Sequence, residues 1–371
     1  MYVRLNLDKE HMTLLDDQTQ LEQLDTGKVV SSIRLLPDQM EQAWEEVKTL
    51  ELPSEFKSVD NVVICGMGGS ALGGRIIDSL IEDRVRVPIE VFNQYSLPHY
   101  VNSKTLVLVN TYSGTTEEAI SMARQAVAKK THVVGVATGG TLKDLFEKEG
   151  KPLYLIHPKA NPSGQPRMGL GYSIAATIAL LAKVGLVHMT DDEFYEIVVK
   201  VREFVIEFDF DIATSENVAK MLAGKFKDKA LIFIASNHLV GVAHAMKNQV
   251  NESSKVFTAL FELPELNHHL LEGLKYPTKL HGVLEFFMIN SDLYHPRIQM
   301  RYPLTADIIK KNGHTVTEFT PRSSSKITQI FEVLTLGSFV SFYLAVLNGV
   351  DPTAIPYVDY FKEQLAKATP N

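Results

Sequence analysis

The sequence predicts an α/β protein in which two parallel sheets, each flanked by helices, follow a helical N-terminal arm. Short runs rich in β-branched residues alternate with helical patterns of roughly 10–14 residues, which is typical of parallel sheets with helices on both faces. The alternation occurs twice, over residues 61–184 and 215–348. The length of 371 residues is typical of about two domains. These three observations together predict the fold class.

The N-terminal arm is expected to span residues 1–58. A helix is predicted to begin at Pro37 and Asp38, because proline suits the first helical position and acidic residues suit the first turn. The apolar residues that follow repeat at helical spacing and predict one buried face, formed by Met40, Ala43, Trp44 and Val47.

The first α/β unit is expected over residues 59–190. Its predicted strands are 61–65, 89–92, 105–110, 132–137 and 152–156, and its predicted helices are 71–83, 116–128, 142–149 and 173–184. A loop rich in proline and glycine, residues 158–166, follows the last of these strands.

The second α/β unit is expected over residues 191–371, with further helices at its C-terminal end. Its predicted strands are 230–235, 256–262, 284–289 and 315–319, and its predicted helices are 191–208, 215–222, 239–253, 266–271, 306–312 and 326–348. The longest apolar stretch, residues 334–347, contains Thr335, Gly337, Ser338 and Ser341. Because it is shorter than the ~20 residues of a membrane span, we interpret it as a buried helix.

Composition excludes several classes of partner. The net charge is −7, and the sequence contains no basic run, so neither nucleic acid nor an acidic membrane is an expected partner. The N-terminus shows no apolar signal core, and the single cysteine, Cys65, cannot form an internal disulfide, which suits a reducing cytoplasm. Cys65 lies within an apolar strand, so we expect it to fill the core rather than to act as a nucleophile.

Two hydroxyl-rich loops stand where a predicted strand is followed by a predicted helix. The first comprises residues 66–70 and the second residues 111–116. Unpaired amides and the helix dipole favour an anion at such positions, most often a phosphate. Neither loop carries the lysine of a P-loop. We therefore expect a phosphate carried by a small molecule.

A dinucleotide-binding loop is the main alternative for residues 66–71, because Gly66, Gly68 and Ala71 fit its spacing. That site requires an acidic residue after the second strand, and the only candidate, Glu90, lies within that strand. It also makes no use of hydroxyls in a second loop. A further alternative is that each serine or threonine is only a helix cap.

The chain resembles the bifunctional phosphoglucose/phosphomannose isomerase family, within the sugar isomerase (SIS) domain superfamily. The resemblance covers residues 30–365, and its motifs fall in the family's order. They are Leu36-Pro37-Asp38-Gln39, the stretch 62–71, Gly164-Gln165-Pro166-Arg167, Asn251-Glu252, Glu265-Leu266-Asn267-His268, and Asp351-Pro352-Thr353 with Lys362.

The resemblance implies two SIS-type domains and an aldose–ketose isomerase without cofactor or metal. The expected substrates are glucose 6-phosphate, mannose 6-phosphate or both, converted to fructose 6-phosphate through a cis-enediol. Glu252 corresponds to the family's base, Arg167 to the residue that stabilises the enediolate, and Lys362 to a lysine near the sugar. The phosphate is expected at the two loops, on Gly68, Gly69, Ser70, Thr111, Ser113 and Thr116.

His268 corresponds to the family's ring-opening histidine, which comes from the neighbouring subunit, so a homodimer with shared active sites is expected. The adjacent His269 stands where the family usually has asparagine, which leaves the assignment open between the two histidines. Glu265 with His268 and His269 could suggest a metal site, but neighbouring helical histidines point about 100° apart.

The family often has serine and asparagine where this chain has Thr111 and Thr115. Thr111 keeps a hydroxyl group, whereas Thr115 loses an amide. The remaining alternative function is a non-catalytic sensor of sugar phosphates, which would need neither a base nor a ring-opening residue.

Overall fold

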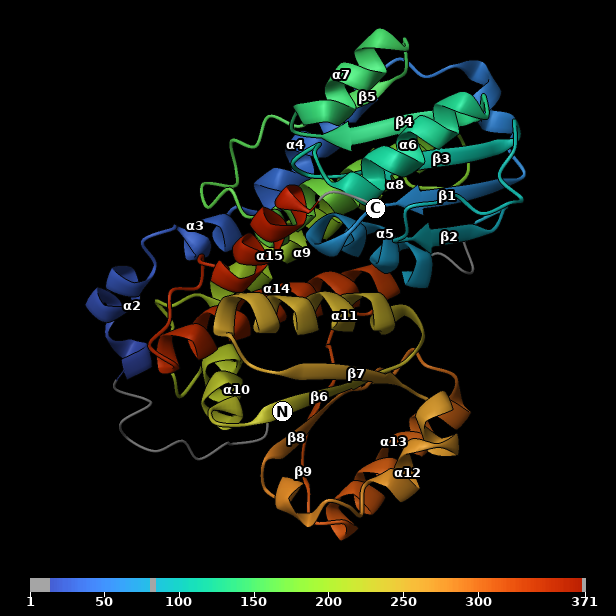
Figure 1. Ribbon diagram of the computed structural model, residues 1–371. Coiled ribbons are helices and arrows are strands. Elements are labelled where there is room, and N and C mark those ends of the chain that lie inside the picture. The colour runs from blue at the N-terminus through green and yellow to red at the C-terminus, as the bar shows by residue number, and fades with distance from the viewer. Residues whose placement is uncertain (1–13, 81–84, 369–371) are drawn as a thin grey trace.

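The computed structural model describes residues 14–80 and 85–368. Two separate parallel sheets lie on either side of a layer of helices that includes α5, α11 and α14 (Figure 1). The predicted fold class is therefore confirmed. The domain boundaries at residues 59 and 191 stay predictions.

The first sheet has the strand order β2-β1-β3-β4-β5, with all neighbours parallel. Helices α5 and α8 cover one face and helices α6 and α7 the other, since alternate residues of β1 belong to separate apolar clusters. The elements are β1 (Asn61–Cys65), α5 (Gly68–Leu80), β2 (Ile89–Phe92), β3 (Thr105–Asn110), α6 (Glu117–Ala128), β4 (His132–Ala137), α7 (Gly140–Lys148), β5 (Leu153–Leu155) and α8 (Leu170–Lys183).

The second sheet has the order β7-β6-β8-β9, also entirely parallel. Its elements are α10 (Val218–Phe226), β6 (Ala230–Ala235), α11 (Val240–Gln249), β7 (Thr258–Glu262), α12 (Leu270–Gly273), β8 (Leu284–Ile289), α13 (Pro296–Lys311), β9 (Thr315–Phe319) and α14 (Lys326–Leu347). Helix α14 is long and apolar enough to cross a membrane, but its apolar window is completely buried in the protein. It is a core helix, as predicted.

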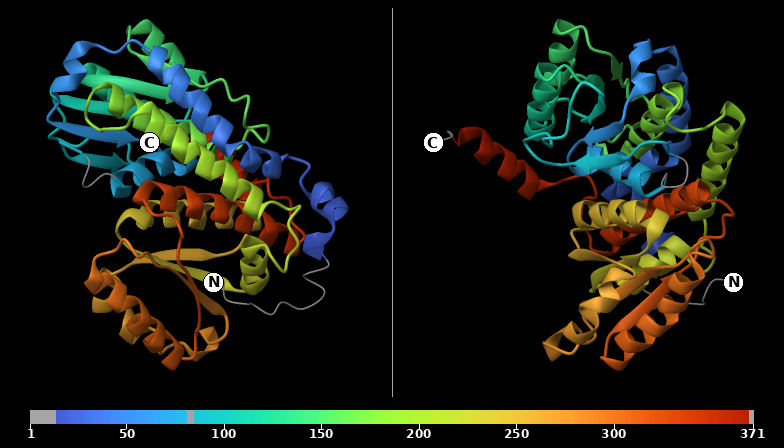
Figure 2. Two further views of the ribbon diagram at one scale, coloured as in Figure 1. Left: turned by 180° about the vertical axis from the view of Figure 1, so that it is seen from behind. Right: turned by 90° about the vertical axis from the view of Figure 1, so that its right-hand side faces the viewer.

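The N-terminal helices pack against both units. They are α2 (Gln18–Leu24), α3 (Val29–Arg34) and α4 (Leu36–Thr49). Helix α4 buries the predicted apolar face against α8 and α9 (Asp191–Phe208), where Trp44 stacks on Phe194 at 4.2 Å. Figure 2 shows α4 and α9 side by side.

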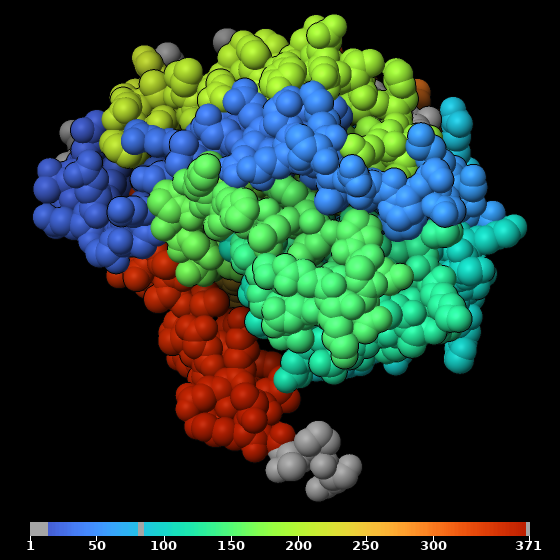
Figure 3. All heavy atoms as spheres, turned by 90° about the horizontal axis from the view of Figure 1, so that it is seen from above, coloured from blue at the N-terminus to red at the C-terminus, as the bar shows by residue number. Residues whose placement is uncertain are grey.

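The last helix, α15 (Pro356–Lys367), projects from the body of the protein (Figures 2 and 3). None of its residues is buried, and several large apolar side chains are exposed on it, including Tyr357, Tyr360 and Phe361. A helix of this length is marginal in water unless an apolar face packs on something.

Several predicted helix bounds were wrong. Helix α13 begins ten residues before the predicted start at residue 306, and it continues through Pro303, a residue that usually disrupts a helix interior. The predicted helix 239–253 ends as a π-helical turn, η4 (Val250–Ser254). The predicted helix 266–271 is instead a 3-10 turn, η5 (Glu265–His268), followed by α12.

Two other helix starts also differ. Helix α5 begins three residues before the predicted start, and the last residues predicted for it, 81–83, lie outside the described part of the chain. Helix α10 begins at Val218, since the side chain of Asn217 accepts hydrogen bonds from the backbone N–H groups of Ala219 and Lys220.

Candidate active site

The two hydroxyl-rich loops meet at the carboxyl edge of the first sheet. Strands β1 and β3 are neighbours, and Cys65 pairs with Val109 at their ends. The backbone N–H of Tyr112 donates a 2.7 Å hydrogen bond to Ser70 Oγ, which joins the loops directly. The strand order reverses between β1 and β3, the position where open α/β sheets bind ligands.

Glycine allows the backbone of both loops to turn closely. A Cβ at Gly66 would lie 2.7 Å from the carbonyl oxygen of Asn110. Gly114 has φ +71°, and a Cβ there would lie 1.7 Å from the carbonyl oxygen of Gly139. Only glycine tolerates both the positive φ and the lack of space for a Cβ at position 114.

The hydroxyl groups of the second loop point toward one another. Thr111 Oγ1 donates to Thr116 Oγ1 at 3.1 Å, and the hydroxyls of Ser113 and Thr115 are 3.0 Å apart. Ser113 is exposed, whereas Thr111 is buried. The first loop runs into the start of α5 and the second precedes α6, so both lie at helix N-termini, where an anion is favoured. The phosphate site itself stays a prediction.

Arg167 lies against the first loop. It belongs to a 3-10 turn, η2 (Pro166–Met168), and a Cβ at Gly69 would lie 3.0 Å from the Arg167 backbone nitrogen. The side chain is 1% exposed and makes five contacts within the protein. Its Nη1 donates to Gln165 Oε1 at 2.8 Å and lies 3.4 Å from Glu252 Oε2, and its Nε donates to Ser253 Oγ at 3.0 Å.

The remaining nitrogen of Arg167 binds the segment before α15. Nη2 donates to the carbonyl oxygens of Pro352 at 2.7 Å and Thr353 at 2.9 Å. Burial lowers the pKa of Arg167, whereas Glu252, Asp351 and Asp359 raise it. The guanidinium therefore joins the loop of the first sheet, the turn of Glu252 and the C-terminal segment.

Glu252 occupies the π-helical turn η4, which continues α11. Burial raises the pKa of this carboxyl, opposed by the positive charges of Arg167, Lys362 and Lys255. Its side chain keeps 29% exposure. A half-buried carboxylate with a raised pKa and one open side is suited to act as a general base near neutral pH.

Lys362 and His268 lie in different surroundings. Lys362 is exposed on α15, close enough for its charge to lower the pKa of Glu252. His268 is exposed at the end of η5, next to α12, and Figure 1 shows α12 and α15 well apart. Among the described residues, no interaction links His268 to Glu252 within one chain.

Buried polar side chains support the loop of Arg167. Gln39 Nε2 donates to the carbonyl oxygens of Ala160 and Met168 at 3.0 and 2.8 Å, and its Oε1 accepts from the N–H of Gly171 at 3.1 Å. Gln249 Nε2 donates to the carbonyl oxygen of Arg167 at 3.0 Å. These two amides fix the backbone around the guanidinium.

The chain is similar in sequence to known proteins over most of its length. Residues 215–365 match the bacterial phospho-glucose isomerase C-terminal SIS domain. The chain is 34% identical, over 91% of its length and 98% of the relative, to a bifunctional phosphoglucose/phosphomannose isomerase of Caldicellulosiruptor bescii. This chain belongs to the bifunctional phosphoglucose/phosphomannose isomerase family. A Thermoplasma volcanium protein of the same name is 28% identical over 87% of this chain and 99% of the relative.

A solved structure supports the fold of the family member described here. A hypothetical protein of Thermus thermophilus superposes with a TM-score of 0.74 over 98% of this chain and 99% of its own, at 15% identity. Family membership makes the protein a sugar-phosphate isomerase. It thereby favours an isomerase over a dehydrogenase or a non-catalytic sensor.

The structure brings most of the predicted family residues together. Five residues from distant parts of the chain form one continuous set at the sheet edge, linked by hydrogen bonds, close backbone contact or electrostatic interaction: Gly69, Ser70, Arg167, Glu252 and Lys362. Thr111, Ser113 and Thr116 line the second loop beside them, and Gly68 adopts φ +50° in the first. His268 is the predicted residue that lies elsewhere.

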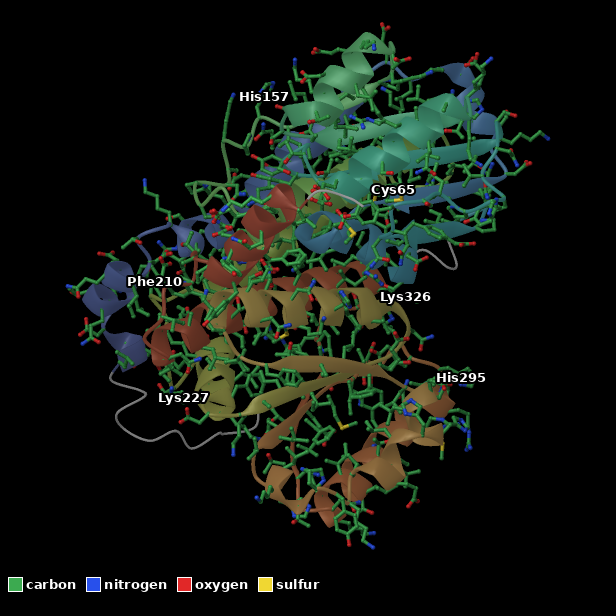
Figure 4. All side chains as sticks on the ribbon, viewed as in Figure 1. Cys65, His157, Phe210, Lys227, His295 and Lys326 are labelled. Atoms are coloured by element: carbon green, nitrogen blue, oxygen red, sulfur yellow. The ribbon has the colours of Figure 1, made fainter. Side chains whose placement is uncertain are left out.

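Other residues of this site carried no sequence signal of their role. Gln165 was part of a recognised motif, but its bond to Arg167 was not predicted. Gln39 belongs to a motif of the resemblance, but its bonds to backbone groups were not predicted. Gln249 and Lys255 become informative only through contacts with distant backbone groups. Cys65, at the end of β1 (Figure 4), is buried, and burial raises the pKa of its thiol, which agrees with a role in packing.

Proposed function

We propose that this isomerase interconverts glucose 6-phosphate and mannose 6-phosphate with fructose 6-phosphate. The observation that carries the proposal is the placement of Glu252 Oε2 3.4 Å from Arg167 Nη1, beside two loops suited to a phosphate. The printed names of the relatives support these substrates. A cytoplasmic location remains part of the proposal.

The reaction moves a proton between C1 and C2 of the open-chain sugar. In our proposal Glu252 removes the proton from one carbon and returns it to the other through a cis-enediol. Arg167 supplies positive charge where the enediolate oxygen develops negative charge. The phosphate is held by Gly68, Gly69, Ser70, Thr111, Ser113 and Thr116, which fixes the distance between the sugar carbons and Glu252.

Acceptance of both C2 epimers requires one base to reach C2 after rotation about the C2–C3 bond. The side chain of Glu252 keeps 29% exposure, so an open-chain sugar can reach its carboxylate. Lys362 approaches from α15 and is proposed to assist ring opening.

A homodimer with shared active sites completes the proposal. His268 lies away from Glu252 in its own chain and is exposed, so it is available to a second subunit. Helix α15 presents an unburied apolar face beside the site. We propose that His268 of one subunit opens the sugar ring bound by the other.

The Glu252→Gln variant tests the proposed base. Amide replacement removes the base and keeps the side-chain shape, so turnover should fall by about 10²–10⁴-fold with little change in substrate affinity. Turnover of glucose 6-phosphate and of mannose 6-phosphate is measured separately by a coupled assay with chelator present, and affinity by calorimetric titration.

Glu262→Gln is the matched control, because this exposed carboxylate ends β7 outside the site. It should retain wild-type turnover. Full activity of Glu252→Gln would reject the proposed base. A wild-type enzyme that converts only one hexose phosphate would restrict the substrate, and one that converts neither would reject the proposed substrates.

Subunit mixing tests the shared site. His268→Ala and Glu252→Gln should each be inactive alone, whereas dimers reassembled from both should regain about a quarter of wild-type activity, since one site in each mixed dimer is intact. His269→Ala serves as the parallel variant. If His268→Ala remains active and His269→Ala does not, the ring-opening role passes to His269.

A further inference from the structure

Lys255 ends the π-helical turn that carries Glu252. Its backbone adopts φ +60°, which turns the chain out of the helix. Its ammonium group then folds back and donates to the carbonyl oxygens of Glu252 at 2.6 Å and Ser253 at 3.2 Å. Carbonyls at a helix end lack backbone donors and carry partial negative charge, so a cation stabilises them.

The same ammonium reaches across to the C-terminal strap, which we define as residues 351–354. Nζ donates to the carbonyl oxygens of Asp351 at 3.0 Å and Ala354 at 2.6 Å. Although Lys255 is exposed as a whole residue, its charged group contacts four carbonyls from two segments about 100 residues apart in the chain.

Arg167 binds the two carbonyl groups of the strap that Lys255 does not contact. Arg167 Nη2 binds the oxygens of Pro352 and Thr353, so four consecutive carbonyls of the strap are held by two cations. Both cations also hold the catalytic turn, Arg167 through Ser253 Oγ and Lys255 through the backbone. The strap leads directly into α15, which carries Lys362.

We propose that Lys255 is a positioning residue of the isomerase, which fixes the carboxylate of Glu252 relative to Lys362 by clamping the strap to the catalytic turn. The printed acceptors of Lys255 are all main-chain oxygens, so it acts through its neighbours rather than on the substrate. The kinetic part of this inference rests on the proposed function. The expected change in the pKa of Glu252 does not depend on the proposed function.

The structure also predicts an electrostatic consequence. The positive charges that face Glu252 come from Arg167 on η2, Lys362 on α15 and Lys255 on its own turn, and each lowers the pKa of the carboxyl. A base must be deprotonated, so activity falls as the pH drops through this pKa. Removal of the Lys255 charge should raise the pKa of Glu252 and move the acid limb of kcat/KM to higher pH.

Three variants test the inference. Lys255→Met removes the charge and the clamp, Lys255→Arg keeps the charge with a different donor geometry, and Lys183→Met is the control. Lys183 Nζ donates at 2.6 Å to the carbonyl oxygen of Lys48, a comparable contact between α8 and the end of α4. Each variant is assayed for kcat, KM, pH profile and thermal unfolding.

Lys255→Met should lower kcat by about 10–100-fold with KM changed by less than about threefold, as expected for a displaced catalytic group. Its acid limb should move to higher pH. Lys255→Arg should keep the wild-type acid limb and recover part of kcat. Lys183→Met should lose stability only.

A spectroscopic readout separates this inference from the proposed function. The ¹³C titration of the Glu252 carboxyl, assigned by comparison with Glu252→Gln, requires no turnover. A higher titration midpoint in Lys255→Met than in wild type supports the positioning role, even in a protein that converts neither hexose phosphate. Unchanged kcat and an unchanged Glu252 midpoint in Lys255→Met would overturn it, whatever the melting temperature.

Discussion

The two sheets share one topology but differ at the equivalent point of each. In both sheets the strand order reverses beside the first strand, between β1 and β3 in one and between β6 and β8 in the other. At the first point, glycines and short hydroxyl side chains form the two loops that we propose hold the phosphate. At the second, buried polar side chains of the protein bond to one another.

Residues that follow β6 and β8 form a buried hydrogen-bond network at the second position. Ser291 Oγ donates to Gln329 Oε1 at 2.6 Å, His238 Nε2 lies 2.9 Å from the same oxygen, and Ser236 Oγ donates to the carbonyl oxygen of Leu263 at 2.8 Å. Ser236, His238, Ser291 and Gln329 are all at most 2% exposed. The two units therefore carry different residues at equivalent sheet edges, and in our proposal the phosphate binds at the first, because function depends on the residues placed at the sheet edge.

The second unit contributes to catalysis from another place. Glu252 and Lys255 come from the far end of α11, and the strap comes from the end of α14. In the proposed mechanism the first unit thus provides the phosphate loops and Arg167, and the second provides the base. Each site depends on the packing of the two units, in which α5 and α11 lie against each other.

The largest expected effect concerns the backbone geometry of the second loop, at the edge of the first sheet. Gly114→Ala places a Cβ 1.7 Å from the carbonyl oxygen of Gly139 at φ +71°, so it should lower the free energy of unfolding by about 3 kcal/mol or more and displace the second loop. Gly150→Ala is the matched control, since φ is +58° there but nothing lies within 4 Å of the new Cβ.

The control should cost about 1 kcal/mol and leave kcat/KM unchanged. Urea denaturation and the coupled assay measure both quantities. Equal stability and activity for the two variants would mean that the close approach to Gly139 does not constrain the second loop.

Much of this architecture could be predicted from local sequence. Strands β1 and β3 begin and end at the predicted residues because a buried parallel strand is a short continuous apolar run, bounded by polar residues. The hydroxyl loops were predictable for a similar reason, since a strand, a glycine-rich turn and a helix lie within a few residues of one another.

The clamp around Glu252 was not predictable in this way. The bond between Arg167 and the carbonyl of Pro352 joins residues 185 positions apart, and backbone carbonyls carry no side-chain signature. The π-helical turn was also missed, because residues 239–253 continue a helical pattern without a proline or glycine at the change. The family resemblance indicated Glu252 as the proposed base but not the contacts that hold it.

The smallest expected effects come from substituting one serine at each of the two sheet edges. Ser70→Ala removes a hydroxyl from the proposed phosphate site, so KM should rise by about 10–100-fold, the effect of losing one hydrogen bond to a charged group. Ser236→Ala removes the bond to Leu263, so the free energy of unfolding should fall by about 1–2 kcal/mol while KM stays within about twofold of wild type. The two variants separate ligand binding from core packing in the segment that follows the first strand of each sheet. A rise in KM for Ser236→Ala as large as that for Ser70→Ala would mean that the second position also affects the substrate, and the contrast drawn between the two sheets would fail.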